Sequence, residues 1–258
     1  MFYALLTDAQ CAMLRAMGTT SHYASVLAID TATNLCSVAL VNDADIKEIQ
    51  RDLPRAHNQH ILTMIDELLE GQSLPEAVSV IACGVGPGSF TGIRVAVGVA
   101  QGLGWSLDLP IYPFCSLEAQ ARATAHSAGD LVLSAIDAQI GQVYWAWFAS
   151  DGTMLRPLTE PAVSKVADLT GPSAEALDAM EVNNVVIAGD GAELITTEHS
   201  DKTFSRVDPE ARPRPSLAAL HLLDVPDDAL LTQAHLLEPR YVQQDIGWKK
   251  LSEQGKRH

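Results

Sequence analysis

The sequence predicts an α/β protein built from two similar halves. Each half opens with strand-like apolar segments and continues with units in which a strand precedes a helix. In the first half the predicted order is three strands, helix, strand, helix, strand, helix, and the second half approximates it. The chain has 258 residues, of which 47% are hydrophobic and 19% charged, a length and composition that support a core of this size. Repetition of this kind is typical of a duplicated α/β architecture.

The first half begins with three strands, which alternating or β-branched apolar residues predict at residues 26–29, 35–41 and 46–53. Turn-forming residues at 30–34 separate the first two strands, so we expect an antiparallel meander. A helix is predicted over residues 58–70, because Ile61, Ile65 and Leu68 recur at helical spacing.

The first half then continues with strand and helix units. A β-branched strand is predicted at 78–83, followed by a glycine-rich turn at 84–88. Ser89 is the predicted N-cap of a helix over 90–107. A strand near Ile111 and a helix opened by Ser116 complete this half.

The second half starts with strands predicted at 132–137 and 142–149, and a hairpin-like turn at Asp151-Gly152 leads into a third strand. A further buried strand is predicted at 185–188 before another helix. The resulting division of the chain has four parts. They are a disordered extension at 1–23, a first unit at 24–127, a second, degenerate unit at 128–223, and a C-terminal segment at 224–258 that packs back on the body.

The charge of the chain restricts its partners. The formal net charge is −15, which disfavours direct binding to nucleic acid because a phosphate backbone attracts a cationic surface. No stretch approaches the roughly 20 apolar residues of a membrane helix, and the N-terminus lacks the basic opening of a secretory signal. We therefore expect a cytoplasmic protein. No two of its four cysteines form a C-x-x-C pair, so we expect buried free thiols.

The strongest local motif is the loop at residues 86–92, which reads GPGSFTG between a strand and a helix. Such a loop could offer backbone N–H groups to a phosphate, but it lacks the lysine of a P-loop. The alternative, which the sequence favours, is a tight turn that lets the helix pack against the sheet. The helix itself carries small residues at Ala96, Ala100 and Gly104, with Gly98 and Gly102 beside them. This stripe suits close helix packing, either within the domain or against another subunit.

Two pairs of residues are candidates for ligand chemistry. His57 and His60 are three residues apart, but no third ligand follows at a spacing typical of metal sites, so solvated or interface histidines are favoured. Asp30 and Asp137 end corresponding strands of the two halves and could hold a metal–phosphate complex between them. Single acids at strand ends also commonly cap turns.

Several motifs together resemble the TsaB (YeaZ) family, the bacterial partner subunits in tRNA threonylcarbamoyladenosine synthesis. The resemblance covers about residues 25–251 and is densest in the first half. Its motifs are LAIDTAT at 27–33, CSVAL at 36–40, RAH at 55–57, GPGSFTGIR at 86–94, AIDA at 135–138, VYWA at 143–146, Glu238-Pro239 with Tyr241, and WKK at 248–250. The sequence departs from the family at Gln139 and Gln243, where the family usually has arginine.

The resemblance implies an actin-like, sugar-kinase-like ATPase fold, made of two ribonuclease-H-like halves with mixed sheets flanked by helices. The paralogue TsaD carries a histidine-containing metal motif after the long helix, and Ser116 and Gln120 stand here in place of its two histidines. A hydroxyl and a neutral amide are poor ligands for a transition metal. The resemblance therefore implies a non-catalytic subunit with no metal and no cofactor bound by this chain alone.

The resemblance also implies the partners. The protein partners are TsaD in a heterodimer and TsaE in a larger complex, and tRNA is contacted only through that complex. When the chain is alone it pairs with a second copy of itself. ATP or ADP would bind at an interface of the complex. We expect the partner surface on the two first-half helices. Its predicted residues are Arg55, His57, His60, Ile61, Met64, Ile65, Leu68, Arg94, Val97, Gly98 and Gln101, with Asp30 and Asp137 as remnants of a nucleotide site. The alternative is an enzyme that acts on its own, either an actin-like ATPase or kinase, or a TsaD-like transferase or metallopeptidase.

Overall fold

A computed structural model describes residues 23–242 of the chain, apart from residues 43, 125, 179–180, 200–203 and 225–227. The predicted N-terminal extension at 1–23 lies outside this part except for Tyr23. Residues 243–258 of the predicted C-terminal segment lie outside it as well. No helix of the described residues is long and apolar enough to cross a membrane.

The first sheet has five strands in the order β3-β2-β1-β4-β5. They are β1 (Ser25–Asp30), β2 (Leu35–Asn42), β3 (Ile46–Asp52), β4 (Val80–Gly84) and β5 (Ile111–Phe114). β1, β2 and β3 pair antiparallel, which confirms the predicted meander, and β4 and β5 add in parallel. The helices that follow these strands are α2 (His57–Leu69), α3 (Leu74–Ala77), α4 (Phe90–Leu107) and α5 (Ser116–Ala123).

The second sheet repeats the strand order of the first. Its strands are β6 (Ala128–Gln139), β7 (Gln142–Asp151), β8 (Leu155–Pro157), β9 (Ala162–Lys165), β10 (Asn184–Ala188) and β11 (Arg206–Asp208). The order is β11-β10-β6-β7-β8, with β9 also paired to β7. As in the first sheet, the central strand β6 pairs antiparallel with the next strand and parallel with β10. The duplicated α/β architecture is confirmed, and its two ribonuclease-H-like halves form the actin-like fold.

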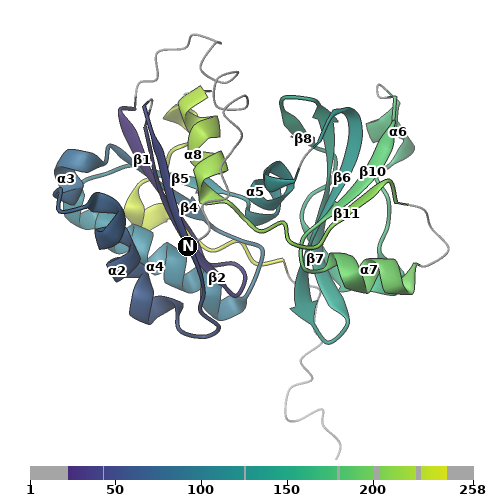
Figure 1. Cartoon of the computed structure of the whole chain (residues 1–258), viewed down its shortest axis with the longest axis horizontal. Helices are drawn as coiled ribbons and strands as arrows, with labels where there is room; N and C mark the ends of the chain where they lie inside the picture. The colour runs from purple at the N-terminus through teal and green to yellow at the C-terminus, as the bar shows by residue number, and fades with distance from the viewer. Residues whose placement is uncertain are drawn as a thin grey trace, which may run out of the picture.

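The remaining helices are short apart from the last α-helix. They are η1 (Val166–Asp168), α6 (Ala174–Leu177), α7 (Ala192–Glu198), α8 (Pro215–Asp224), η2 (Asp228–Leu230) and η3 (Ala234–Leu236). Figure 1 shows the two sheets side by side, with α2 and α4 on the outer side of the first and α7 beside the second.

Alternation along β1 places its side chains in two separate cores. Leu27 and Ile29 face α2 and α4, whereas Val26 and Ala28 face α8. Side chains of a strand point alternately to its two faces, so a strand that is buried on both faces is apolar throughout. Each fully buried large aliphatic side chain stabilises the fold by about 1.5–3 kcal/mol relative to an exposed one.

Two helices pack across the predicted boundaries between the units. α8 falls within the predicted second unit but packs on β1 and β2 of the first sheet, through Ala218, Ala219 and Leu222. α5 falls within the predicted first unit, yet its Leu117 and Ala121 lie in the core of the second sheet. Helical periodicity identifies an apolar face but not the sheet that this face covers, so the sequence pattern could not assign either helix.

Two of the predicted buried thiols are confirmed. Cys36 and Cys83 are free and fully buried, and Cys115 is half-buried and free. Burial, with a smaller contribution from the Asp30 carboxylate, raises the pKa of the Cys36 thiol to about 12. Because the thiolate is the reactive form, Cys36 is inert at neutral pH. Cys11 lies outside the described residues.

Candidate functional site

The GPGSFTG loop packs directly on the end of β1. The Ser89 N–H donates to the Ala32 carbonyl at 2.7 Å, and the Ser89 hydroxyl caps α4 by accepting from Gly92 N at 3.3 Å. Thr31 Oγ1 donates to the Gly92 carbonyl at 2.7 Å. The predicted N-cap is confirmed. Since the N–H groups of Ser89 and Gly92 have partners within the chain, this loop supports the tight-turn interpretation over a phosphate cradle.

The glycines of this loop are required by close backbone contacts. A Cβ on Gly88 would lie 2.4 Å from the Ala32 carbonyl oxygen, and one on Gly92 would lie 2.1 Å from that of Thr31. Both distances are far below van der Waals contact with backbone atoms that have little freedom to move. The motif therefore fixes the start of α4 against the sheet.

Asp30 is buried at the end of β1, and both of its carboxylate oxygens accept hydrogen bonds. Oδ1 accepts from the Ala32 N–H at 2.9 Å, and Oδ2 accepts from the Ser116 hydroxyl at 2.6 Å. Burial raises the pKa of Asp30 to about 6, although the hydrogen bonds from Ser116 and Ala32 act in the opposite direction. A carboxylate that is 2% exposed and already bonded is poorly placed to coordinate a metal–nucleotide complex.

Asp137 occupies the corresponding position at the end of β6, where it is half-buried. Its Oδ1 accepts from the Gln139 N–H at 2.7 Å, as in a capped turn, and its own N–H donates to Asp190 Oδ1 at 2.8 Å. Burial raises the pKa of Asp190, and the neighbouring Asp137 carboxylate contributes in the same direction. Sequence reasoning missed Asp190, whose only signal is the GDG turn after β10. Among the described residues, no group of three or more His, Cys, Asp or Glu side chains is placed to hold a metal ion.

Several predicted partner residues are instead part of the core of the first half. Ile61, Met64, Ile65 and Leu68 on α2, and Val97 on α4, are each less than 5% exposed. They pack on the first sheet, together with the stripe of Ala96 and Ala100. Their assignment to an exposed partner surface is therefore wrong, because the sheet needs the whole apolar ridge of α2 to cover it.

His57 is also buried rather than available to a partner. It is 6% exposed, and its Nε2 lies 3.0 Å from the Asn34 carbonyl oxygen. This contact ties the start of α2 to the turn between β1 and β2. Gln101, by contrast, is half-buried, and its Nε2 donates to the Leu237 carbonyl at 2.9 Å, which fixes the C-terminal segment alongside α4.

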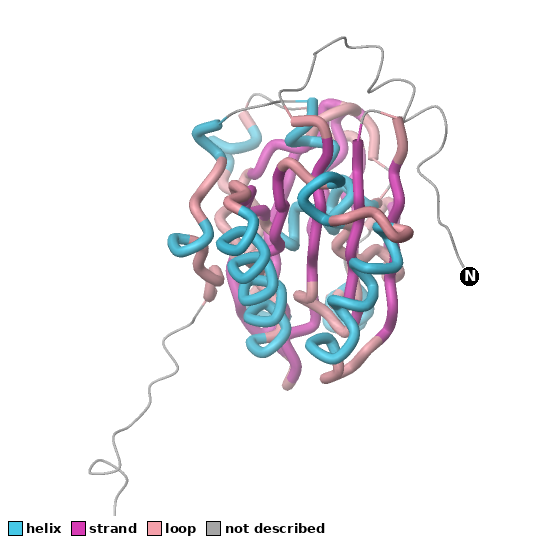
Figure 2. The backbone as a smooth tube through the Cα atoms, turned by 90° about the vertical axis from the view of Figure 1, so that its left-hand side faces the viewer, coloured by secondary structure: helices cyan, strands magenta, loops and turns pink. Residues whose placement is uncertain are grey.

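The outward face of α4 is formed by small residues. Gly98 and Gly102 are one helical turn apart and exposed, and a Cβ on either would meet no atom of the described residues within 4 Å outside the adjacent backbone of the helix. Val95 and Val99 are half-buried beside them, and on α2 Leu62 is 58% exposed while His60 is half-buried. Figure 2 looks onto this layer of helices. We call the surface formed by Leu62, Val95, Gly98, Val99 and Gly102 the outer helix face.

Arg94 lies at the N-terminal end of the outer helix face, between two aromatic rings. Its guanidinium carbon is 3.2 Å from the centroid of the Phe90 ring and 5.0 Å from that of Tyr241. Phe90 is 59% exposed and Tyr241 is 41% exposed. Arg55 is exposed as well, in the turn before α2, where its φ is 63°. The side chains of both arginines are therefore accessible to solvent.

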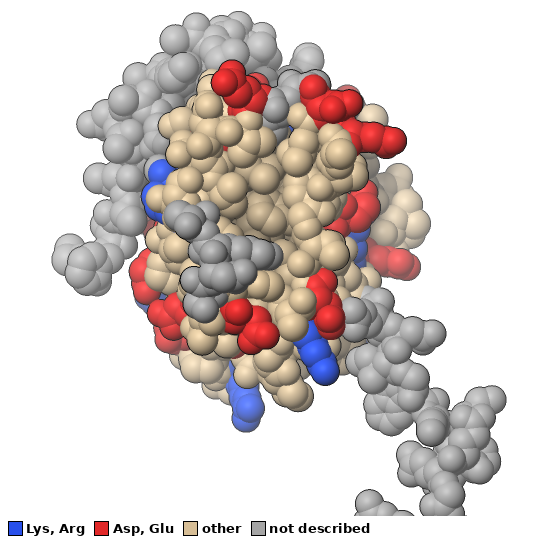
Figure 3. Space-filling view, turned by 90° about the vertical axis from the view of Figure 1, so that its right-hand side faces the viewer, with Lys and Arg blue, Asp and Glu red and all other residues tan. Residues whose placement is uncertain are grey.

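The opposite side of the molecule differs in character. Figure 3, which views the second half, shows acidic and fewer basic side chains around a broad uncharged centre. This distribution agrees with the formal net charge of −15. A direct nucleic-acid surface is not supported on this side.

Comparison with known proteins gives consistent similarities. A sequence model of the family described as TsaD, tRNA N6-adenosine threonylcarbamoyltransferase, matches residues 51–218. The tRNA threonylcarbamoyladenosine biosynthesis protein TsaB of Haemophilus influenzae is 33% identical over 240 residues, which span 88% of this chain and 97% of that protein. TsaB of Escherichia coli K12 is 44% identical over 129 residues, which span 49% of this chain and 55% of that protein.

A solved structure resembles the whole described fold. YeaZ from Pseudomonas aeruginosa superposes with a TM-score of 0.72 at 30% sequence identity. The match covers 84% of this chain and 99% of that one. The similarity therefore extends over both halves rather than over a single motif.

Proposed function

Because the chain belongs to the TsaB (YeaZ) family, we propose that it is a non-catalytic scaffold subunit in the synthesis of threonylcarbamoyladenosine in tRNA. In this proposal the chain binds TsaD and supports transfer of threonylcarbamoyl to the adenosine beside the anticodon of tRNAs that read ANN codons. TsaE joins in a larger complex, and tRNA is contacted through that complex. Alone, the chain forms a homodimer through the same surface, and ATP or ADP binds at a complex interface.

The outer helix face is the observation that carries the proposal. It combines an exposed leucine, two half-buried valines and two glycines that leave open space above α4. Glycines inside a helix cost about 1 kcal/mol each relative to alanine, and among the described residues no side chain or distant backbone lies where a Cβ of residue 98 or 102 would be. Close approach of a partner helix would supply those contacts. A standard interface of about 1,600 Å² would need both α2 and α4.

Two further observations support a subunit that does not act as an enzyme. Asp30 is buried and bonded to Ser116 and Ala32, so its carboxylate is not free to serve a metal–nucleotide complex. The acidic balance of the chain suits a subunit whose complex contacts tRNA through more basic partners.

The experiment measures binding to TsaD by calorimetry with variants of the outer helix face. Leu62→Arg and Gly102→Arg each place a charge on the surface proposed to be buried, and we expect at least a tenfold loss of affinity, equivalent to about 1.4 kcal/mol. Leu194→Arg is the matched control, since Leu194 is 37% exposed on α7 in the second half.

One outcome would contradict this assignment of the partner surface. If both variants keep a native circular dichroism spectrum and bind TsaD as tightly as the Leu194→Arg control, the partner surface lies elsewhere. Turnover of ATP by the isolated chain that disappears in Asp30→Asn would favour the enzyme alternative.

A further inference from the structure

Helix α5 lies between the two sheets and belongs to the cores of both. Leu117 and Ala121 pack in the core of the second sheet, with Val132 and Phe148. Ala119, on another side of the helix, packs with the first sheet and α8. Figure 1 shows α5 in this central position. Helix α5 therefore makes packing contacts with both halves.

The first polar contact of α5 joins it to the first sheet. The Ser116 hydroxyl donates to Asp30 Oδ2 at 2.6 Å, and both residues are at most 2% exposed. A short hydrogen bond to a buried carboxyl group is among the stronger side-chain contacts in proteins. It connects the start of α5 to the end of β1.

The second polar contact lies one helical turn later and joins α5 to the second sheet. The Nε2 of Gln120 faces three oxygens, Ser134 Oγ at 3.0 Å, Ala135 O at 3.1 Å and Ala188 O at 3.1 Å. These atoms belong to the neighbouring strands β6 and β10. Gln120 Oε1 is buried without a hydrogen-bond partner among the described residues, so the amide is held through its donors alone.

Both contacts fill spaces that only glycine leaves open. A Cβ on Gly84 would lie 2.1 Å from Asp30 Oδ2, and a Cβ on Gly189 would lie 2.1 Å from Gln120 Nε2. The two glycines stand at the ends of β4 and β10, which are equivalent strands of the two halves. The polar side chains are thus enclosed in the same way on either side of α5.

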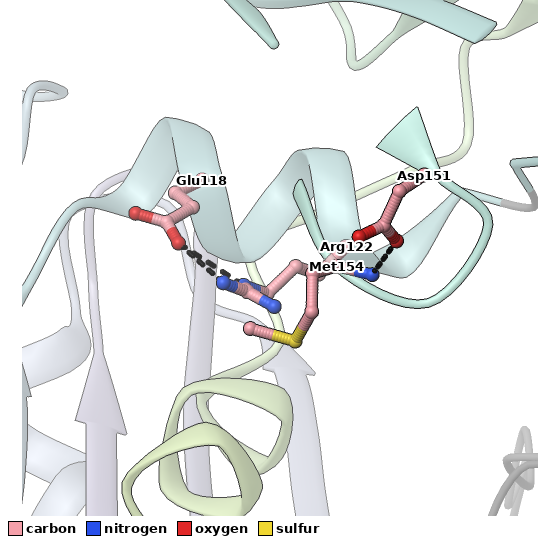
Figure 4. A network of polar contacts seen from close by, with 4 residues as sticks. All are labelled: Glu118, Arg122, Asp151 and Met154. Carbon is pink, nitrogen blue, oxygen red and sulfur yellow. Dashed lines mark hydrogen bonds and ion pairs between the residues drawn. The ribbon is translucent and has the colours of Figure 1, made fainter. Parts of the chain in front are cut away.

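A third side of α5 adds an ion pair at the surface between the halves. Arg122 Nη2 lies 2.6 Å from Glu118 Oε1, one turn apart on the helix. Figure 4 shows the guanidinium of Arg122 pointing along α5 toward the carboxylate of Glu118. Because this pair is partly exposed, it adds less than the two buried contacts.

We propose that Ser116 and Gln120 form an interdomain lock that holds the two halves at one fixed angle without any ligand between them. Ser116 bonds to the first sheet and Gln120 to the second, so a hinge motion would have to break buried hydrogen bonds on one side of α5. Such a motion would leave a buried carboxyl group or buried carbonyl groups without partners. The lock goes beyond the scaffold role proposed above, because it is a property of the isolated chain.

The test measures the distance between the two halves by pulsed electron–electron double resonance. Spin labels are attached through unnatural amino acids at Asp66 on α2 and Glu193 on α7, both exposed, and the labelled protein is diluted with unlabelled chain to suppress distances between copies. We expect one narrow distance distribution in the wild type, unchanged by Mg-ATP. The double variant combines Ser116→Ala with Gln120→Met, and the second of these substitutions preserves side-chain volume. In this variant we expect the width of the distance distribution to increase about twofold or more.

Matched controls remove equivalent groups that do not join the halves. Ser106→Ala deletes a hydroxyl that bonds within α4, and Gln101→Met deletes an amide that bonds to the Leu237 carbonyl, in the C-terminal segment beside α4. Both should keep the wild-type distribution. A wild-type distribution that is already broad or that shifts with Mg-ATP would overturn the lock. So would a folded double variant with the wild-type distribution. If the double variant does not fold, the wild-type measurement and the single variants still decide.

Discussion

Arg214 and Glu48 are far apart in the sequence, yet they form a forked ion pair. Nε and Nη2 of Arg214 lie 2.8 and 2.6 Å from Glu48 Oε2. The Glu48 side chain is 8% exposed and that of Arg214 is 20% exposed. Glu48 is on β3, at the edge of the first sheet, and Arg214 directly precedes α8. The pair therefore anchors the start of α8 after the chain has passed through the second half.

This ion pair should contribute measurably to stability. We expect Arg214→Ala to lower the free energy of unfolding by about 2–4 kcal/mol, because it leaves the Glu48 carboxylate buried without its partner. Urea titration of both single variants and the double variant gives the coupling energy. The exposed pair of Lys47 and Glu70 is the control, and its Lys47→Ala variant should change stability by less than about 1 kcal/mol. Equal effects at the two sites would contradict the prediction.

Asp30 should make stability depend on pH in the direction opposite to most carboxylates. Burial raises its pKa to about 6 in the folded chain, above the ordinary value of 3.8. Between these two values the folded state holds a proton that the unfolded state has released, so the contribution of Asp30 to stability rises as the pH falls.

Comparison with Asp30→Asn isolates this effect from other titrating groups. From pH 7 to pH 4, the free energy of unfolding of the wild type should gain about 2–3 kcal/mol relative to that variant. Urea unfolding at several pH values gives the difference directly. A difference that stays constant with pH would mean that the pKa of Asp30 is not raised.

Gly92 and Gly98 lie in the same helix and should respond oppositely to the same substitution. Gly92→Ala places a methyl group against the Thr31 carbonyl oxygen and should destabilise the fold by about 2–4 kcal/mol. Gly98→Ala meets open space and should stabilise the isolated chain by about 0.5–1 kcal/mol through helix propensity. Thermal unfolding of both variants tests the pair, and the same sign of effect for both would refute the orientation of α4 described above.

The isolated chain should not retain a transition metal. Ser116 and Gln120 are poor metal ligands and are already bonded to Asp30 and to the second sheet. Elemental analysis after dialysis against a chelator should find only substoichiometric iron and zinc. One metal ion per chain would contradict this expectation.

The pattern of the sequence predicts most of the first half correctly, because its elements carry strong local signals. Helix α4 begins at its predicted N-cap Ser89, and α2 lies within one residue of its predicted limits. The family resemblance, which rested above all on the GPGSFTGIR motif, is confirmed by the similarity to TsaB of Haemophilus influenzae and YeaZ of Pseudomonas aeruginosa. The turn at Asp151-Gly152 leads into β8, as predicted, whereas the short strands β9 and β11 are missed, since three or four residues show no clear period.

The candidate surface was less predictable than the fold. Periodicity identifies Met64 and Gly98 as parts of apolar or small stripes, but it does not tell which stripe faces the sheet. The structure places Met64 inward and Gly98 outward. Likewise the bond between Ser116 and Asp30 joins residues 86 positions apart, and no local pattern could indicate it.

The return of α8 to the first sheet has a consequence for how the protein is made. The face of β1 that carries Val26 and Ala28 is covered by residues 215–224, near the end of the chain. During synthesis, therefore, the first half emerges from the ribosome with this apolar sheet face not yet covered by α8, which is made about 90 residues later. We expect a fragment that ends at residue 127 to aggregate or recruit chaperones, because it lacks the helix that covers this face.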